Sequence, residues 1–189
     1  MARRATLAPR DLACTLARSL SMILGLTNLG AVHTLISLVA LGAGAWALIR
    51  DKAIVPDNGL GKTYVWATVL TCLTGFGIFR HGGFGPPHML GIITLLVLGL
   101  AAIAWRGRLG KASAYVATAS YTLTFFFHMI PGFTETFTRL PAASPLFAGP
   151  DDPALQKTIG VVFVAFLVGG TVQLIRLRKL RRSLPGAMA

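Results

Sequence analysis

The stretch Arg80-His81-Gly82-Gly83-Phe84-Gly85-Pro86-Pro87-His88 interrupts a long apolar sequence near its middle. A run that holds three glycines and two prolines cannot continue a helix, so it predicts a tight turn. Long apolar blocks lie on both sides of the turn, and a histidine stands near each of its ends. We expect the turn to join two similar helical hairpins.

The composition is that of a membrane protein. Of the 189 residues, 54% are hydrophobic and 13% are charged, and the mean hydropathy is +0.68. Soluble domains carry about 25% charged residues, whereas each apolar block here approaches the roughly 20 residues that cross a bilayer. The net charge of +12 comes mostly from residues at the ends of apolar blocks. Such residues meet lipid head groups, so we expect the bilayer, and not nucleic acid, as the partner.

The pattern predicts an all-α membrane protein, a bundle of five transmembrane helices. The expected spans are 30–49, 63–79, 87–105, 112–130 and 158–175. Four domains follow: a basic segment with an interfacial helix at 1–29, a four-helix core of two hairpins at 30–131, an outward-facing loop at 132–157, and the fifth helix with a basic tail at 158–189. Pro131 and Gly132 are expected to end the fourth span. A short sixth span before residue 30 is the alternative.

Basic residues set the orientation. The connections after spans one, three and five hold three, three and five Lys or Arg residues, whereas the other side holds only Arg80, Arg139 and Lys157. Since Lys and Arg mark the cytoplasmic side, the central turn and the 132–157 loop should face outward and the C-terminus should be cytoplasmic. An aromatic belt is expected at the cytoplasmic ends of the spans. Its members are Trp46, Tyr64, Trp66, Trp105 and Tyr115.

Self-comparison indicates an internal repeat. His33-Thr34-Leu35 opens the first span, and His88-Met89-Leu90 opens the third. The second and fourth spans open with Tyr64-Val65-Trp66-Ala67-Thr68 and Tyr115-Val116-Ala117-Thr118. Repeated hairpins of like orientation would be related by an axis along the membrane normal.

The four histidines, His33, His81, His88 and His128, all fall at outer ends of spans. His33, His88 and His128 each lie 17 residues from the cytoplasmic boundary of their span, which is at Arg50, Trp105 and Lys111 respectively. This spacing places them at one depth, about 25 Å from that boundary. His81 is expected in the turn above them.

A shared depth suggests a binding site in the outer half of the bundle. Two of His33, His88 and His128 could be axial ligands of one haem b. Alternatively, these three histidines and His81 could bind a transition-metal ion, since imidazole is the commonest metal ligand. Either form would give a redox or metal-handling protein. The rival interpretation is that the histidines form only local hydrogen bonds near helix ends.

The sequence assigns no catalytic residues and leaves enzymatic activity open. It contains no Ser/His/Asp order, no glycine-rich phosphate loop and no acidic pair inside a span. A small-molecule transporter is one alternative, and its polar path would use the threonines and serine of spans two and four. An accessory or assembly subunit without chemistry of its own is another.

The chain resembles a family of small bacterial inner-membrane proteins of unknown function. The resemblance rests on His33, on Leu60-Gly61-Lys62, on the run from Phe84 to Leu90 and on Ile130-Pro131-Gly132. It implies a multi-pass inner-membrane protein with several histidines and no established activity. The family's histidines before spans two and four are absent here, which leaves the outer cluster. A weaker similarity to membrane b-type cytochromes would allow one haem at most.

Overall fold

The computed structural model describes residues 28–79, 83–141 and 143–183. The interfacial helix expected within 1–29 lies outside this range except for residues 28 and 29. His81 also lies outside it. The described residues form helices and no strands, which confirms the all-α class. The elements are α2 (Asn28–Arg50), α3 (Gly59–Gly75), α4 (Pro86–Trp105), a 3₁₀ turn η1 (Gly110–Ala112), α5 (Ser113–Phe137) and α6 (Pro153–Ser183).

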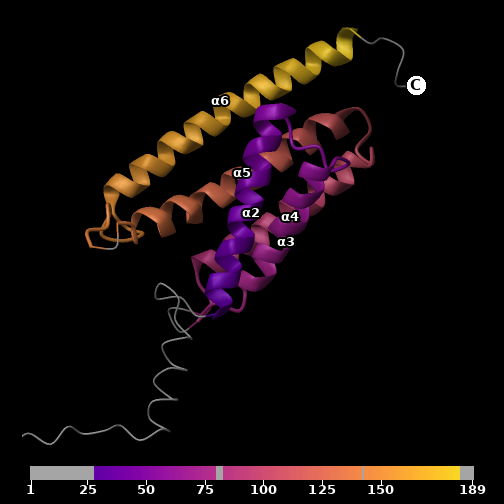
Figure 1. The fold of residues 1–189 in the computed structure, drawn as a ribbon. Helices are drawn as coiled ribbons and strands as arrows, with labels where there is room; N and C mark the ends of the chain where they lie inside the picture. The colour runs from indigo at the N-terminus through magenta and orange to yellow at the C-terminus, as the bar shows by residue number, and fades with distance from the viewer. Residues whose placement is uncertain (1–27, 80–82, 142, 184–189) are drawn as a thin grey trace, which may run out of the picture.

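The helices pack as two hairpins and one further helix. α2 packs against α3, and α4 packs against α5 (Figure 1). α5 also contacts α2 and α6, so it joins the two hairpins and supports the long C-terminal helix. The described part of the chain therefore contains both hairpins on which the sequence prediction was built.

Three of the described helices, α2, α4 and α6, are long and apolar enough to cross a membrane. Their large apolar side chains point outward: Leu35, Leu96 and Val161 are 64%, 68% and 70% exposed. Contiguous apolar surface of this kind is rare on soluble monomers. The surface therefore supports membrane association.

The second helix begins and ends four residues earlier than the predicted 63–79 span. Asn58 caps it by accepting a hydrogen bond from the Gly61 amide at 2.8 Å, as an N-cap residue does. Gly61 also allows close packing of the backbone, because a Cβ there would lie 1.8 Å from the Val55 carbonyl oxygen. The prediction followed hydropathy and missed these signals, so it was wrong about both ends of α3.

The predicted end of the fourth span at Pro131 is also wrong, since α5 continues to Phe137. Proline removes one backbone donor, but membrane helices accept this loss where other groups compensate locally. The connection that follows is accordingly shorter than 132–157. It ends where the Asp152 carboxylate accepts the Ala154 amide at 2.8 Å and Pro153 opens α6.

Small residues let α2 approach its neighbours closely. A Cβ on Gly44 would lie 2.7 Å from the Phe125 ring and 2.8 Å from the Tyr64 ring. Ala43 and Ala47 are buried against Tyr64. Such small-residue contacts are typical of membrane helix packing.

The connection between α2 and α3 is held by polar contacts. Arg50 pairs with Asp51 at 2.7 Å, and Asn58 donates to the same carboxylate at 2.8 Å. The hydrogen bond from Arg50 holds the pKa of Asp51 below its usual value. Trp105 of α4 donates to Asp57 at 3.0 Å, which ties the two hairpins together at this end.

Candidate functional site

One face of α3 carries hydroxyl groups toward the interior of the bundle. Tyr64, Thr68, Thr71 and Thr74 follow each other at intervals of four, three and three residues, which places them roughly on one side of a helix. Tyr64 and Thr68 are fully buried. Side chains from α2 and α5 meet this face, and we call the set the polar seam. Its members are His33, Ser37, Tyr64, Thr68, Thr71, Thr74, Thr124 and His128.

Tyr64 is a fully buried member of the polar seam. Its hydroxyl is 2.8 Å from Thr124 Oγ1, and Thr124 donates its own hydrogen to the Tyr121 carbonyl at 2.8 Å. Tyr64 must therefore be the donor to Thr124. The prediction that Tyr64 belongs to an interfacial belt was wrong, because it lies in the core while Trp46 and Trp66 are exposed. Its place on the Thr68 and Thr71 face was the signal that could have revealed this.

His128 enters the polar seam from α5. Its Nε2 lies 3.0 Å from Thr68 Oγ1, and its ring meets the Tyr64 ring edge-on with centroids 6.1 Å apart. Only 6% of His128 is exposed. An imidazole this deep needs hydrogen-bond partners, and Thr68 supplies one of them.

His33 enters from α2, and its contacts fix the position of its ring hydrogen. Nδ1 lies 3.0 Å from Thr74 Oγ1. The Thr74 hydroxyl also lies 2.7 Å from the Leu70 carbonyl, its shortest contact, so we assign the hydroxyl hydrogen there. Thr74 then accepts from His33, Nδ1 carries the hydrogen, and Nε2 of the neutral ring keeps its lone pair.

The two interior histidines are neighbours but are staggered. His33 and His128 meet the same helix, α3, from α2 and α5 respectively. Their partners Thr74 and Thr68 are six residues apart, however, about 9 Å along α3. Between them, Ser37 donates to the His33 carbonyl at 2.8 Å, and its oxygen lies 3.4 Å from Thr71 Oγ1, a long contact. The polar seam is thus a line of groups along α3 and not a closed cluster.

His88 makes a different set of contacts at the start of α4. Its ring is stacked between Phe79 and Phe84, with centroid distances of 5.0 and 5.2 Å. Nδ1 accepts the Gly85 amide at 3.2 Å, which caps the helix. Because Nδ1 is an acceptor, Nε2 of the neutral ring carries the hydrogen. This buried Nε2 has no hydrogen-bond partner.

The three predicted site histidines therefore divide into an interior pair and a helix cap. Over residues 28–79, 83–141 and 143–183, no three His, Cys, Asp or Glu side chains come together in a way that could hold a metal ion. His81 lies outside these residues. Binding of a metal ion or haem by the histidines stays a prediction.

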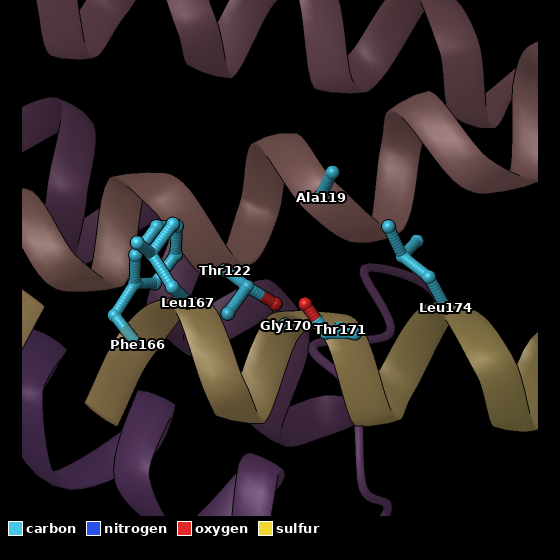
Figure 2. Close-up of a pocket in the computed structure, with 7 residues that line it drawn as sticks. All are labelled: Ala119, Thr122, Phe166, Leu167, Gly170, Thr171 and Leu174. Atoms are coloured by element: carbon cyan, nitrogen blue, oxygen red, sulfur yellow. The ribbon is translucent and has the colours of Figure 1, made fainter. Parts of the chain in front are cut away.

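Two grooves of the described surface lie on α6, and no histidine lines either of them. One groove of about 150 Å³ runs between α5 and α6 (Figure 2). Its lining is Ala119, Thr122, Phe166, Leu167, Gly170, Thr171 and Leu174. Thr122 and Thr171, labelled in Figure 2, contribute hydroxyl groups to an otherwise mostly apolar lining. Neither this groove nor the neighbouring one on α6 includes a residue of the polar seam.

Comparison of the chain with protein-family models, with curated proteins and with solved structures finds no match. The resemblance to a family of small inner-membrane proteins stays a prediction.

Proposed function

We propose that this chain is a multi-pass protein of a bacterial inner membrane in which all five described helices cross the bilayer. Support comes from the connections: each hairpin pairs an apolar helix, α2 or α4, with an antiparallel partner, α3 or α5. If α2 and α4 cross the membrane, their partners must return across it. The excess of Lys and Arg at one end supports a cytoplasmic location for that end and for the C-terminus.

Within this bundle, we propose that the polar seam binds a transition-metal ion as cargo, so that the protein handles metal at the outer half of the membrane. The observation that carries the proposal is the orientation of His33. Thr74 holds the ring through Nδ1 and leaves the Nε2 lone pair for a ligand. Metal-binding histidines are oriented in this way by a partner on the other ring nitrogen.

The stagger of His33 and His128 favours exchangeable binding. A structural zinc site closes around its ion with four ligands, whereas each imidazole here stands beside hydroxyls on a separate part of α3. Sites that pass an ion onward are weak and multiple. We therefore propose that one ion is bound at His33 and at His128 in succession. Imidazole suits zinc, copper, iron and nickel, so we expect the ion to be one of these.

Haem b fits the described interior less well than an ion. A porphyrin between His33 and His128 would need a cavity, and the packing beside them is tight. A Cβ on Gly75 would lie 3.2 Å from the His33 ring, and a Cβ on Gly44 would press on Tyr64 and Phe125.

The test is metal analysis of the full chain. The protein is purified in mild detergent from metal-replete cells and its metal content and absorption spectrum are recorded. We expect bound metal that is reduced in His33→Ala and in His128→Ala and lost in the double variant, with no Soret band. The matched control, His88→Ala, should keep its metal.

Wild-type protein that contains no bound metal would contradict the proposal. A Soret band that depends on the histidines would replace it with the haem hypothesis. A metal-free protein that co-purifies with a stable complex would instead favour an accessory subunit.

A further inference from the structure

Two histidine–threonine pairs lie in the polar seam, and the roles of their threonines differ. At His33, the Thr74 hydroxyl donates to the Leu70 carbonyl and therefore accepts from Nδ1. At His128, Nε2 lies 3.0 Å from Thr68 Oγ1. The direction of this second hydrogen bond decides whether the Nε2 lone pair of His128 is already engaged.

The Thr68 hydroxyl is turned toward the histidine and not toward its own helix. Thr74 and Thr94 each donate to the carbonyl four residues earlier at 2.7 Å. The closest hydrogen-bond partner of Thr68 among the described residues is instead His128. Thr68 is fully buried, so its hydrogen needs an acceptor inside the protein. We assign this hydrogen to Nε2, which places the ring hydrogen of His128 on Nδ1.

This assignment makes the two histidines unequal toward an ion. Thr74 holds the His33 ring and leaves its Nε2 lone pair for a ligand. At His128, the lone pair accepts from Thr68. An ion can therefore bind His33 directly, whereas it must displace a hydroxyl to bind His128.

A displaced Thr68 hydroxyl has a second acceptor at Tyr64. Tyr64 precedes Thr68 by one helical turn on the same face of α3, and its hydroxyl is a side-chain hydrogen-bond partner of Thr68. Tyr64 donates its own hydrogen to Thr124, which donates in turn to the Tyr121 carbonyl. The Tyr64 oxygen therefore keeps lone pairs that can accept from Thr68.

We infer that Thr68 is a positioning residue that makes His128 the weaker of the two binding positions. The inference rests on the proposed binding of a metal ion by the polar seam. In the metal-free protein the Thr68 hydroxyl donates to His128, and it turns to Tyr64 when an ion takes the Nε2 lone pair. The hydroxyl only rotates, so no proton is gained or lost. An ion then binds first at His33 and afterwards at His128.

The experiment isolates His128 by titrating zinc into the full chain carrying His33→Ala in mild detergent. Binding is followed through the ring signals of ¹⁵N-labelled histidine. In this background, Thr68→Val should strengthen zinc binding roughly fivefold, because zinc no longer displaces a hydrogen bond worth about 1 kcal/mol. Tyr64→Phe should weaken zinc binding roughly fivefold, because the displaced hydroxyl loses its acceptor.

Two further variants separate this role from general packing. Tyr64→Phe combined with Thr68→Val should have the zinc affinity of Thr68→Val alone, because no hydroxyl remains to be displaced. Thr68→Ser keeps the hydroxyl and should keep the affinity of the His33→Ala parent. Before zinc is added, the spectrum should show the His128 hydrogen on Nδ1. Thr68→Val should then shift the Nε2 signal toward that of a lone pair without a hydrogen bond.

A His128 ring hydrogen on Nε2 in the metal-free protein would overturn the inference. So would an unchanged or weaker zinc affinity in Thr68→Val, or a Thr68→Ser variant that behaves like Thr68→Val. These three results would leave metal binding by the polar seam intact. Absence of zinc binding in the wild-type chain would overturn the metal-binding proposal and this inference together.

Discussion

His33 and His88 hold matching positions in the two hairpins, yet their rings are used in opposite ways. Each stands near the first turn of an apolar helix, α2 or α4. His33 donates through Nδ1 to Thr74 inside the bundle. His88 accepts at Nδ1 from Gly85 at the edge of the central turn. The His33 ring is left with a lone pair at Nε2, and the His88 ring is left with an N–H at Nε2.

The difference comes from the neighbours of each helix and not from the histidines. The first turns of α2 face hydroxyls of α3, which can accept from a ring nitrogen. The first turn of α4 instead follows a glycine and lies between two phenylalanines. A histidine near the start of a helix can therefore be used in different ways, because the packing partner decides the chemistry that it can perform.

The largest expected difference between the two histidines is in zinc affinity. We expect His33→Ala to weaken zinc binding more than roughly 100-fold, since losing a ligand should exceed the 10–100-fold effect of losing its orienting partner. His88→Ala should change the affinity less than about twofold. Isothermal titration in detergent measures both values. Equal losses in the two variants would show that His33 and His88 do not differ in zinc binding.

The next difference concerns Thr74, which orients His33. Thr74→Val keeps the side-chain shape but removes the acceptor, so zinc affinity should fall roughly 10-fold to 100-fold. Thr94→Val is the matched control, because Thr94 is buried in α4 and its hydroxyl donates to its own helix at Leu90. If both variants bind zinc equally, Thr74 does not position the ring.

A smaller effect should appear in stability at the central turn. His88→Ala removes the cap of α4 and should lower the free energy of unfolding by about 1 kcal/mol. His88→Gln should recover much of this loss, because glutamine at the same position can accept the Gly85 amide. Thermal unfolding in detergent, followed by circular dichroism, provides the measurement. Failure of glutamine to exceed alanine would argue against a capping role.

The smallest effect concerns the aromatic stack. Phe84→Ala should lower the free energy of unfolding by about 0.5 kcal/mol through the lost ring contact. Met89→Ala changes a half-exposed neighbour, so it should cost less. Zinc affinity should be unchanged in both. A change in zinc affinity on removing Phe84 would connect the turn to the polar seam.

Much of the fold was available in the sequence. α2 and α4 lie within two residues of their predicted spans, because long apolar blocks and the Pro86-Pro87 start define them. The predictions were wrong about both ends of α3, the C-terminal end of α5 and both ends of α6, which runs beyond the predicted 158–175 span on each side. Hydropathy marks the apolar part of a helix, while Asn58 extends α3 into polar sequence and α5 tolerates Pro131.

The candidate site was less accessible to prediction. Residue counting placed His33, His88 and His128 at the outer ends of helices, but depth does not fix the direction in which a side chain points. Whether a ring meets a hydroxyl or a backbone amide depends on helix rotation and on the facing helix. The ring tautomers depend further on the contacts of Thr74 and Gly85, which no spacing reveals.

The most direct test of the account is nuclear magnetic resonance of the full chain labelled with ¹⁵N only in histidine. The chain has four histidines, so the ring signals can be assigned by single substitutions. Without metal, His33 should show its hydrogen on Nδ1 and His88 on Nε2. Addition of zinc should shift the ring signals of His33 and His128 and leave those of His88 in place. Zinc shifts at His88 with none at His33 or His128 would contradict the account.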